Sequence, residues 1–266
     1  ERCLFLRQLL CSLFMDRYKV TVCYDGTNYA GWQKQDNARS IQEEIECALA
    51  KINEEAVEIV ASGRTDAHVH ALAQVFHFDA KKALSDEQWV RACNSLLPKD
   101  IRILKVEKVS DSFHARFDAV RKRYDYYITN DVLNPFLENY MGKDRKSLDV
   151  AYMQECANVF IGTHDFTSFT SSKIDERKSR IKTIYRLEVQ QEANAVHIIF
   201  EGNAFLRYMV RMLAQVLIEA GKHRLTKEAI SQMLEAKDKH ACRYKASANG
   251  LYLVRVDYQD NSSPMG

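Results

Sequence analysis

The pattern of apolar and polar residues predicts strands and helices that alternate along the chain. Residues alternate in character over 18–24 and 101–109, as in strands with one buried face. After Ser40, apolar residues recur every three or four positions, which predicts an amphipathic helix, and Ser40 with Glu43 fits a capping box. The apolar stripe of this helix consists of Ile41, Ile45, Ala48, Leu49 and Ile52.

A second helix is predicted to begin at Ser85, because Ser85 and Gln88 are also spaced as a capping box. Its expected buried face consists of Trp89, Ala92, Leu96 and Leu97. Two short strands are expected at 58–62 and 73–78, on either side of a turn at 63–66.

A similar series follows in the second half of the chain. It comprises a strand at 124–129, a helix at 150–161, a hairpin pair at 181–189 and 195–200, an apolar helix at 205–220, a helix capped by Thr226, and a strand at 251–258. Hairpin-like strands mixed with helices favour an α+β fold. We therefore expect two related α/β halves that share a mainly antiparallel, mixed-order central sheet flanked by helices.

The length of 266 residues corresponds to one large or two small domains. The two series meet near 111–121, so we expect an N-terminal half at 15–115 and a C-terminal half at 116–260. Residues 1–14 faintly resemble a signal peptide without a cleavage site, and we interpret them as a non-native or upstream extension before Met15. Residues 261–266 are expected to be a polar tail.

The composition is that of a soluble globular protein, and it does not indicate what the protein binds. Hydrophobic residues make up 46% and charged residues 28%, as in soluble globular proteins, and no apolar stretch is long enough for a membrane helix. The net charge is only +2, so a basic surface has to come from local clusters; these are 121–123, 173–182 and 222–224. Seven cysteines without a CxxC pair favour reduced thiols in a cytoplasmic protein.

The densest group of chemically active residues lies in the turn at 63–70. On residue types alone, three interpretations compete. Asp66 and Arg64 could be ordinary turn residues; His68 and His70 could bind a metal with Asp66; or Asp66 could be a nucleophile or base kept ionised by an arginine. Metal binding is the least favoured, because no third histidine or cysteine has a suitable spacing.

Six segments, in order, resemble the tRNA pseudouridine synthase A family, and the resemblance extends from Tyr18 to Tyr258. They are YDGTNYAGWQKQ at 24–35, GRTDAHVHA at 63–71, FHARF at 113–117, RKRYDY at 121–126, FIGTHDFTSF at 160–169 and FLRYMVR at 205–211. The resemblance implies a pseudouridine synthase fold with a catalytic cleft between its two halves. It also implies a homodimer that binds tRNA and isomerises uridine at positions 38 to 40 of the anticodon stem-loop, without metal or cofactor.

The resemblance also assigns roles to residues. Asp66 corresponds to the catalytic carboxylate, Arg207 to the cation beside it, and Tyr124 to the aromatic ring that stacks on the uracil. Leu251 would form an apolar wall of the site, and Arg64 would fill the space that the extruded base leaves or hold phosphate. Further RNA contacts are expected from His68, His70, Arg121 and Arg123.

Three departures from the family pattern affect substrate choice more than reaction type. His68 stands where the family usually has glycine, Gln215 replaces a small residue, and KASANG at 245–250 departs from TAPAxG. If the backbone at His68 has a positive φ, histidine is tolerated there at some energetic cost. A diverged paralogue that modifies another RNA uridine and a non-catalytic RNA-binding module therefore stay open as alternatives.

Overall fold

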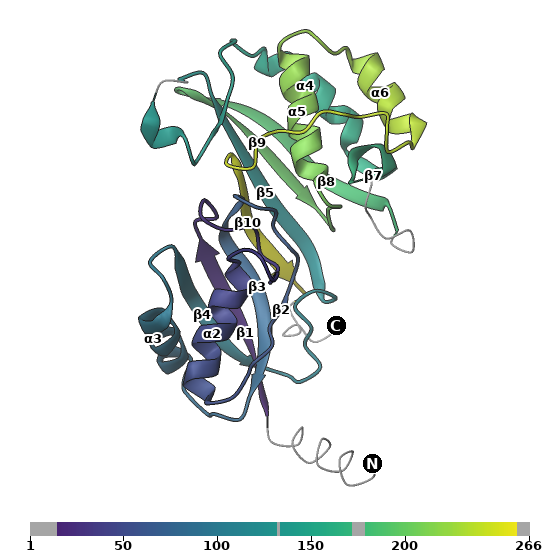
Figure 1. Cartoon of the computed structure of the whole chain (residues 1–266). Coiled ribbons are helices and arrows are strands. Elements are labelled where there is room, and N and C mark those ends of the chain that lie inside the picture. Colours follow the sequence, from purple (N-terminus) through teal and green to yellow (C-terminus); the bar gives the residue numbers. More distant parts are fainter. Residues whose placement is uncertain (1–14, 132–133, 172–178, 260–266) are drawn as a thin grey trace. The chain divides into compact units, whose positions relative to one another are not determined.

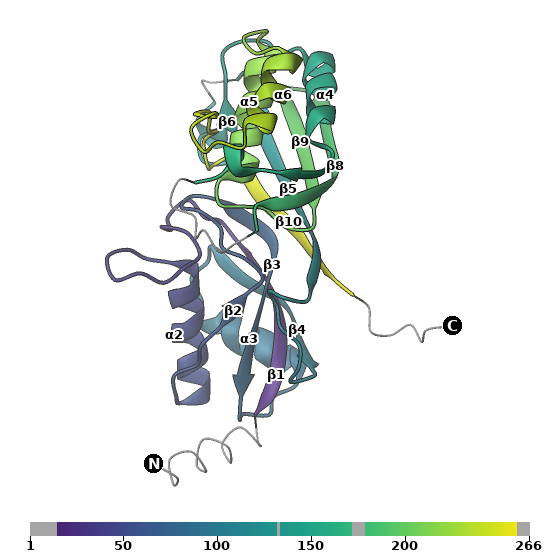
Figure 2. The same ribbon diagram turned by 90° about the vertical axis from the view of Figure 1, so that its right-hand side faces the viewer.

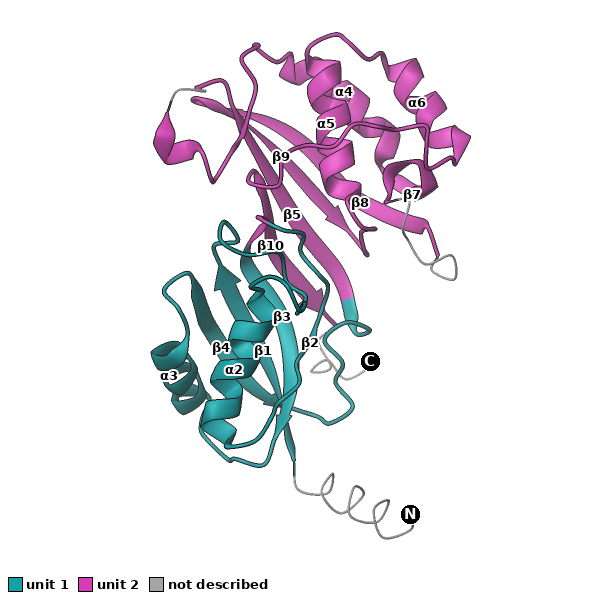
Figure 3. Ribbon diagram, in the orientation of Figure 1, with its two compact units in different colours: residues 1–67, 71–119 teal, residues 68–70, 120–266 magenta. Residues whose placement is uncertain are grey.

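The computed structural model describes residues 15–131, 134–171 and 179–259 (Figure 1). The chain forms two compact units, coloured separately in Figure 3. Unit 1 comprises residues 1–67 and 71–119, and unit 2 comprises 68–70 and 120–266. The predicted extension 1–14, the tail 261–266 and most of the basic cluster 173–182 lie outside the described residues.

Unit 1 contains an antiparallel sheet with two helices on one face. Its strands are β1 (Asp16–Tyr24), β2 (Val60–Ala61), β3 (His70–Ala80) and β4 (Ile101–Val109). β1 pairs with both β3 and β4, and β2 pairs with the other side of β3. The helices are α2 (Ile41–Asn53) and α3 (Asp86–Leu96), and Trp89 of α3 packs against Tyr18 and Phe78 of the sheet.

Both predicted helix starts in unit 1 are confirmed. The Ser40 side chain accepts a hydrogen bond from the Glu43 amide, and Ser85 and Gln88 form a reciprocal capping box. All five residues of the α2 stripe are buried. The predicted buried face of α3 is wrong at Leu96, which is 43% exposed, because the helix ends there and the extended Leu97 is buried in its place.

Unit 2 is the larger unit, and its helices lie against one face of its strands (Figure 2). Its sheet has the order β10-β5-β9-β8-β7, and β6 pairs in parallel with β5. The strands are β5 (Ala119–Thr129), β6 (Gly142–Lys143), β7 (Gly162–Asp165), β8 (Ile181–Glu192), β9 (Ala195–Gly202) and β10 (Leu251–Tyr258). The helices are α4 (Val150–Ala157), α5 (Met209–Gly221) and α6 (Lys227–Ala236), and short 3-10 turns lie at Pro135–Leu137, Asn158–Phe160 and Thr167–Phe169.

The core of unit 2 forms between α5 and the inward face of its sheet. Its cluster of buried residues includes Tyr126, Ile198 and Phe200 of β5 and β9 together with Leu213 and Leu217 of α5. The predicted α+β class, with a mainly antiparallel sheet and flanking helices, is confirmed.

Several element boundaries differ from the sequence prediction. α5 begins at Met209 rather than Phe205, because Tyr208 adopts a left-handed conformation with φ of 67° and interrupts helical geometry. Arg207 therefore lies in a turn rather than on the helix. The strand expected at 58–62 is reduced to two residues, whereas β3 and β5 are longer than expected.

Among the described residues, no helix combines the length and apolar character needed to cross a membrane. Five cysteines fall within the described part of the chain, and all are free thiols. Cys93, Cys156 and Cys242 are buried, Cys23 is half-buried, and Cys47 is exposed on α2.

A buried histidine connects β3 of unit 1 to the segment that leads to β5. The His77 ring is 5% exposed, and its Nδ1 accepts a hydrogen bond of 3.1 Å from the Ala115 amide. Burial lowers the pKa of His77 to about 4; the neighbouring Arg17 and His114 lower it further, whereas Asp79 and Asp118 oppose the shift. The ring is therefore neutral at pH 7, which leaves Nδ1 able to accept.

We expect His77 to make the fold sensitive to acid. The unfolded chain binds the His77 proton with a pKa near 6.5 and the folded chain with a pKa of about 4. The free energy of unfolding should therefore be highest above about pH 6.5 and fall towards pH 4, by up to about 3 kcal/mol from this group. Urea unfolding of wild type and His77→Gln at pH 7 and pH 4.5 measures this. The glutamine keeps an acceptor and does not titrate, so equal pH dependence in both proteins would contradict the assignment.

Candidate active site

Thr65, next to Asp66, is held at two of its atoms by the first motif of the chain. The Tyr24 and Thr65 hydroxyls form a hydrogen bond of 2.8 Å, and the Trp32 amide donates to the Thr65 carbonyl at 3.1 Å. Thr65 is buried, Asp66 is half-buried and Arg64 is exposed. Fixing Thr65 sets the direction in which the chain presents Asp66.

Gly31 allows this approach because it has no side chain. Its φ is +104°, and a Cβ atom added there would lie 2.8 Å from the Thr65 carbonyl oxygen and 3.1 Å from the Ala67 nitrogen. Only glycine combines that conformation with that proximity. The first motif and residues 65–67 of the second, which are far apart in the sequence, therefore pack against each other within unit 1.

The other end of the turn is held by Gln74, which sequence reasoning missed. The Gln74 side chain is fully buried; its amide donates to the Gly63 carbonyl at 3.0 Å, and its oxygen accepts from the Ser62 hydroxyl at 2.6 Å. The Ser62 amide also donates to the Val75 carbonyl at 2.7 Å. The sequence does contain a clue to this role. Gln74 is an isolated amide in the apolar strand predicted at 73–78, and a polar side chain buried there needs hydrogen-bond partners.

The two histidines after Asp66 have different environments. His68 is exposed with φ of 64°, so the position does have the positive φ that favours glycine. A non-glycine residue there carries a strain of about 1 kcal/mol.

His70 is 2% exposed, its Nε2 donates to the Asn139 carbonyl at 2.9 Å, and its ring stacks on Tyr252 with centroids 4.8 Å apart. This burial disagrees with the prediction that His70 contacts RNA. The ring supports unit 2 from within.

Three further predicted site residues belong to unit 2. Tyr124 is half-buried on β5 and packs edge-to-face on Phe205, with centroids 5.3 Å apart at 84°. Leu251 begins β10 and is 5% exposed in the core. Arg207 is exposed; its guanidinium lies 4.8 Å from the Tyr208 ring and donates to the Tyr208 hydroxyl at 3.0 Å. Asp66 belongs to unit 1, so the assembly of these groups around one uridine stays a prediction.

Arg121 and Arg123, which are predicted to contact RNA, have protein partners on β5 and its neighbours. Arg123 forms two hydrogen bonds of 2.8 Å to the carboxylate of Asp125, which is 2% exposed. Although burial opposes it, hydrogen bonds from His197 and Arg123 hold the pKa of Asp125 below its usual value. Arg121 lies over the Tyr185 ring at 5.1 Å and 3.8 Å from Glu201.

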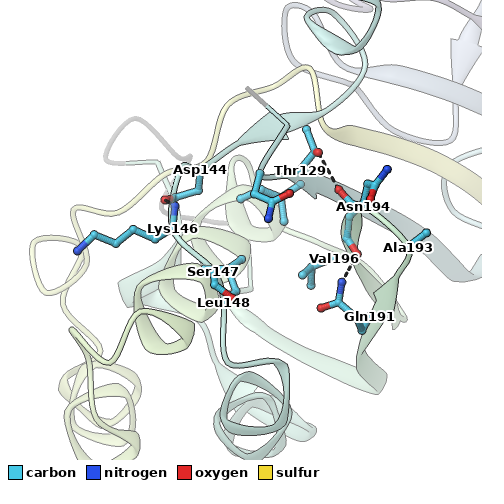
Figure 4. Close-up of a pocket in the computed structure, with 12 residues that line it drawn as sticks. Thr129, Asp144, Lys146, Ser147, Leu148, Gln191, Ala193, Asn194 and Val196 are labelled. Atoms are coloured by element: carbon cyan, nitrogen blue, oxygen red, sulfur yellow. Dashed lines mark hydrogen bonds between the residues drawn. The ribbon is translucent and has the colours of Figure 1, made fainter. Parts of the chain in front are cut away.

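A cavity of about 90 Å³ lies elsewhere in unit 2 and includes none of these residues (Figure 4). Thr129, Asp144, Gln191 and Asn194 are among its lining residues. Asp144 also pairs with the buried Lys222 at 2.6 Å.

Gln215, one of the departures from the family pattern, joins the same buried polar network. The Lys222 ammonium lies 2.7 Å from Glu219, and the Gln215 amide donates to Glu219 at 2.9 Å. The added amide is therefore satisfied within the unit. In the part of the chain that the structure describes, no group of three or more potential metal ligands comes together.

Comparison with known proteins decides the family. The sequence profile of the family described as tRNA pseudouridine synthase matches residues 20–118 and 156–259. The chain belongs to this family. As a member of the tRNA pseudouridine synthase family, it is an isomerase that converts uridine to pseudouridine.

Curated relatives agree over nearly the whole chain. The tRNA pseudouridine synthase A of an Exiguobacterium species is 43% identical over 245 residues, covering 92% of this chain and 99% of the relative. The Oceanobacillus iheyensis protein of the same name is 40% identical over 251 residues, covering 94% and 99%. A chain from the crystal structure of a Cbf5-Nop10-Gar1 complex aligns with a TM-score of 0.34 at 13% identity, over 88% of this chain and 57% of that one. That similarity is too low to support a conclusion.

We expect Gly31→Ala to displace the residues around Asp66. Both the positive φ and the 2.8 Å approach to the Thr65 oxygen disfavour a side chain, so the free energy of unfolding should fall by about 2–4 kcal/mol, and activity should be lost. Gly162→Ala is the matched control, because Gly162 has φ of +103° but a Cβ there meets only the His164 ring at 3.6 Å. Urea unfolding and turnover are measured for both variants. Both carry the strain of a positive φ, but only Gly31→Ala also forces a side chain against the Thr65 oxygen. Equal losses of stability and activity in the two variants would contradict the role given to the approach of Gly31 to Thr65.

Proposed function

We propose that this chain isomerises uridine to pseudouridine at positions 38 to 40 of the tRNA anticodon stem-loop, with Asp66 as the catalytic carboxylate. The observation that carries the proposal is the fixed position of Asp66. It follows Thr65, whose hydroxyl is bonded to Tyr24 and whose carbonyl is bonded to Trp32. These restraints hold the backbone that carries the carboxylate in one position, as a preorganised reactive group requires.

The reaction needs one carboxylate and no resident cofactor in its simplest form. The bond between N1 of uracil and C1′ of ribose breaks, the base turns, and C5 bonds to C1′. C5 then loses its proton and N1 gains one, so that the product is an isomer of the substrate. A carboxylate can assist by attacking the base or the sugar or by removing a sugar proton. Each of these routes requires Asp66 to be ionised when the base is bound.

Arg207 is the proposed cation beside Asp66. Exclusion of water from the occupied site raises the energy of an isolated carboxylate, and a permanent guanidinium offsets this. The packing of Arg207 on the Tyr208 ring holds the side chain in a defined direction. Tyr208 is the residue directly before α5, and its left-handed backbone separates the turn that contains Arg207 from the helix.

Tyr124 and Leu251 are the proposed contacts to the uracil. The edge-to-face packing on Phe205 fixes the plane of the Tyr124 ring, so that one ring face could stack on the extruded base. Leu251 would provide an apolar wall from the start of β10.

The proposed substrate is tRNA, bound by a homodimer in the cytoplasm. Arg64 is exposed beside Asp66 and suits a contact to phosphate or to the space that the flipped base leaves. His68, Arg121 and Arg123 are the other proposed RNA contacts. Two alternatives remain, namely a paralogue that acts on another RNA uridine and a non-catalytic RNA-binding module.

We expect Asp66→Asn to abolish turnover while keeping tRNA affinity within about tenfold, or about 1.4 kcal/mol. The amide preserves shape and removes the charge that the chemistry needs. The measurement is tritium release from tRNA carrying 5-tritiated uridine, with binding measured in parallel and the modified positions mapped. An active Asn variant would refute the role of Asp66. Release from wild type at positions other than 38 to 40 would favour the paralogue, and binding without release the non-catalytic module.

We expect Arg207→Lys to reduce turnover by at least about tenfold while leaving the urea midpoint near that of wild type. Arg207 is exposed, so the fold loses little, whereas a lysine cannot present two parallel donors to a carboxylate. Turnover and urea unfolding are compared for the same preparations. Parallel losses of stability and activity would indicate a structural arginine.

A further inference from the structure

The turn at residues 113–118 of unit 1 presents a phenylalanine to solvent. Phe117 is 75% exposed, although it lies in a segment that carries one of the six motifs. Ala115, two residues earlier, is fully buried. The segment is therefore anchored in the unit and displays one large apolar side chain outward.

The base of the turn is fixed by β1 and β3. The Ala115 amide donates to Nδ1 of His77, and Arg17 donates to the Phe113 carbonyl at 2.9 Å. Arg17 is itself held by two hydrogen bonds of 2.7 Å to the Asp79 carboxylate. These bonds keep both ends of the 113–115 segment in register with the sheet.

The top of the turn is fixed by its own side chains. Nδ1 of His114 accepts from the amides of Arg116 at 3.1 Å and Phe117 at 3.2 Å. The Asp118 carboxylate accepts from the His114 amide at 2.7 Å, and the Asp118 amide donates to the His114 carbonyl at 3.1 Å. The exposure of Phe117 is therefore a property of an ordered turn.

The groups around Phe117 match the chemistry of an unpaired nucleotide. The His114 ring lies 4.2 Å from the Phe117 centroid, at 31° to it, and the exposed Arg116 guanidinium lies 5.8 Å from that centroid. Proteins bind unstacked bases on exposed aromatic rings and hold the adjoining phosphates with arginine. The carboxylate of Asp118 is directed to the His114 amide within the turn.

A second copy of the chain fits this surface less well. Phe117 is flanked in sequence by charged Arg116 and Asp118, both exposed, so the turn offers one ring rather than an apolar patch. A stable protein interface buries roughly 800 Å² on each partner with an apolar centre. One ring with an adjacent cation corresponds better to a single base and its phosphate.

We propose that the 113–118 turn is a further RNA-binding site, at which Phe117 stacks on an unpaired base of the tRNA substrate and Arg116 contacts the adjoining phosphate. This proposal rests on the proposed function, and it adds a binding contact separate from the catalytic loop. His77 and His114 are positioning residues, because they hold the turn.

Binding and turnover of Phe117 variants test the proposal. Phe117→Ala should raise the Kd for unmodified tRNA and the KM for tritium release by about tenfold, because a stacked base contributes on this scale. Phe117→Trp should restore both values, since indole also stacks. Leu104→Ala is the matched control, as Leu104 is 52% exposed on β4 and lies outside the turn. Arg116→Ala should lower the slope of log Kd against log salt concentration by about one, the amount that corresponds to one lost phosphate contact. Arg116→Lys should keep the wild-type slope, because lysine retains the positive charge.

The outcomes separate this site from the proposed function. Tritium release by wild type with unchanged Kd and KM in Phe117→Ala would overturn the site and leave the function standing. A raised Kd in Phe117→Ala without release by any protein would support the site while the function fails. Urea midpoints and light scattering accompany each variant. A lowered midpoint or a dimer lost only in Phe117→Ala would overturn the proposal in favour of a structural or self-association role.

Discussion

The close approach of Gly31 to the backbone of residues 65–67 is the constraint on which the candidate site depends. Two chain segments meet there at a distance that excludes even a methyl group, and the Trp32 amide closes the contact on the Thr65 carbonyl. Main-chain hydrogen bonds and tight packing leave little freedom of rotation. Asp66 follows directly, so the position of the proposed catalytic carboxylate is set by atoms that take no part in the chemistry.

Buried polar side chains provide the rest of this support in unit 1. Gln74 holds the start of the turn, and neutral His77 holds the segment that leads to β5. Each satisfies a main-chain group that would otherwise be buried without a partner, which costs about 1–3 kcal/mol. Such a hydrogen bond also orients the main-chain segment, because donor and acceptor must be aligned. Tyr24, Gly31 and Trp32 of the first motif act in the same way, because they hold Thr65 in place.

The departures from the family pattern have separate physical consequences. Histidine at position 68 occupies a left-handed backbone position beside the proposed catalytic residue, which places an exposed imidazole where glycine would present none. Gln215 is accommodated by Glu219 and Lys222 within unit 2. The first departure changes an exposed surface, whereas the second is accommodated by hydrogen bonds within unit 2. Under the proposed function, the change at position 68 is therefore the one that an RNA substrate would meet.

The sequence by itself determined most of the elements and the family, and it singled out Asp66 as the candidate carboxylate, because periodicity, caps and ordered motifs are local properties. The stripe of α2 and the capping box of α3 followed directly from residue spacing, as did the bounds of β4 and β10. Only the tertiary structure decided that Gly31 lies against Thr65, that Gln74 and His77 anchor neighbouring turns, and that His70 is buried. It also placed Arg207 before α5 rather than on it, through a backbone conformation that residue type alone does not reveal. Contacts between residues distant in sequence depend on how the elements pack. Apolar periodicity predicts which face of an element is buried, but it does not predict which element packs against that face.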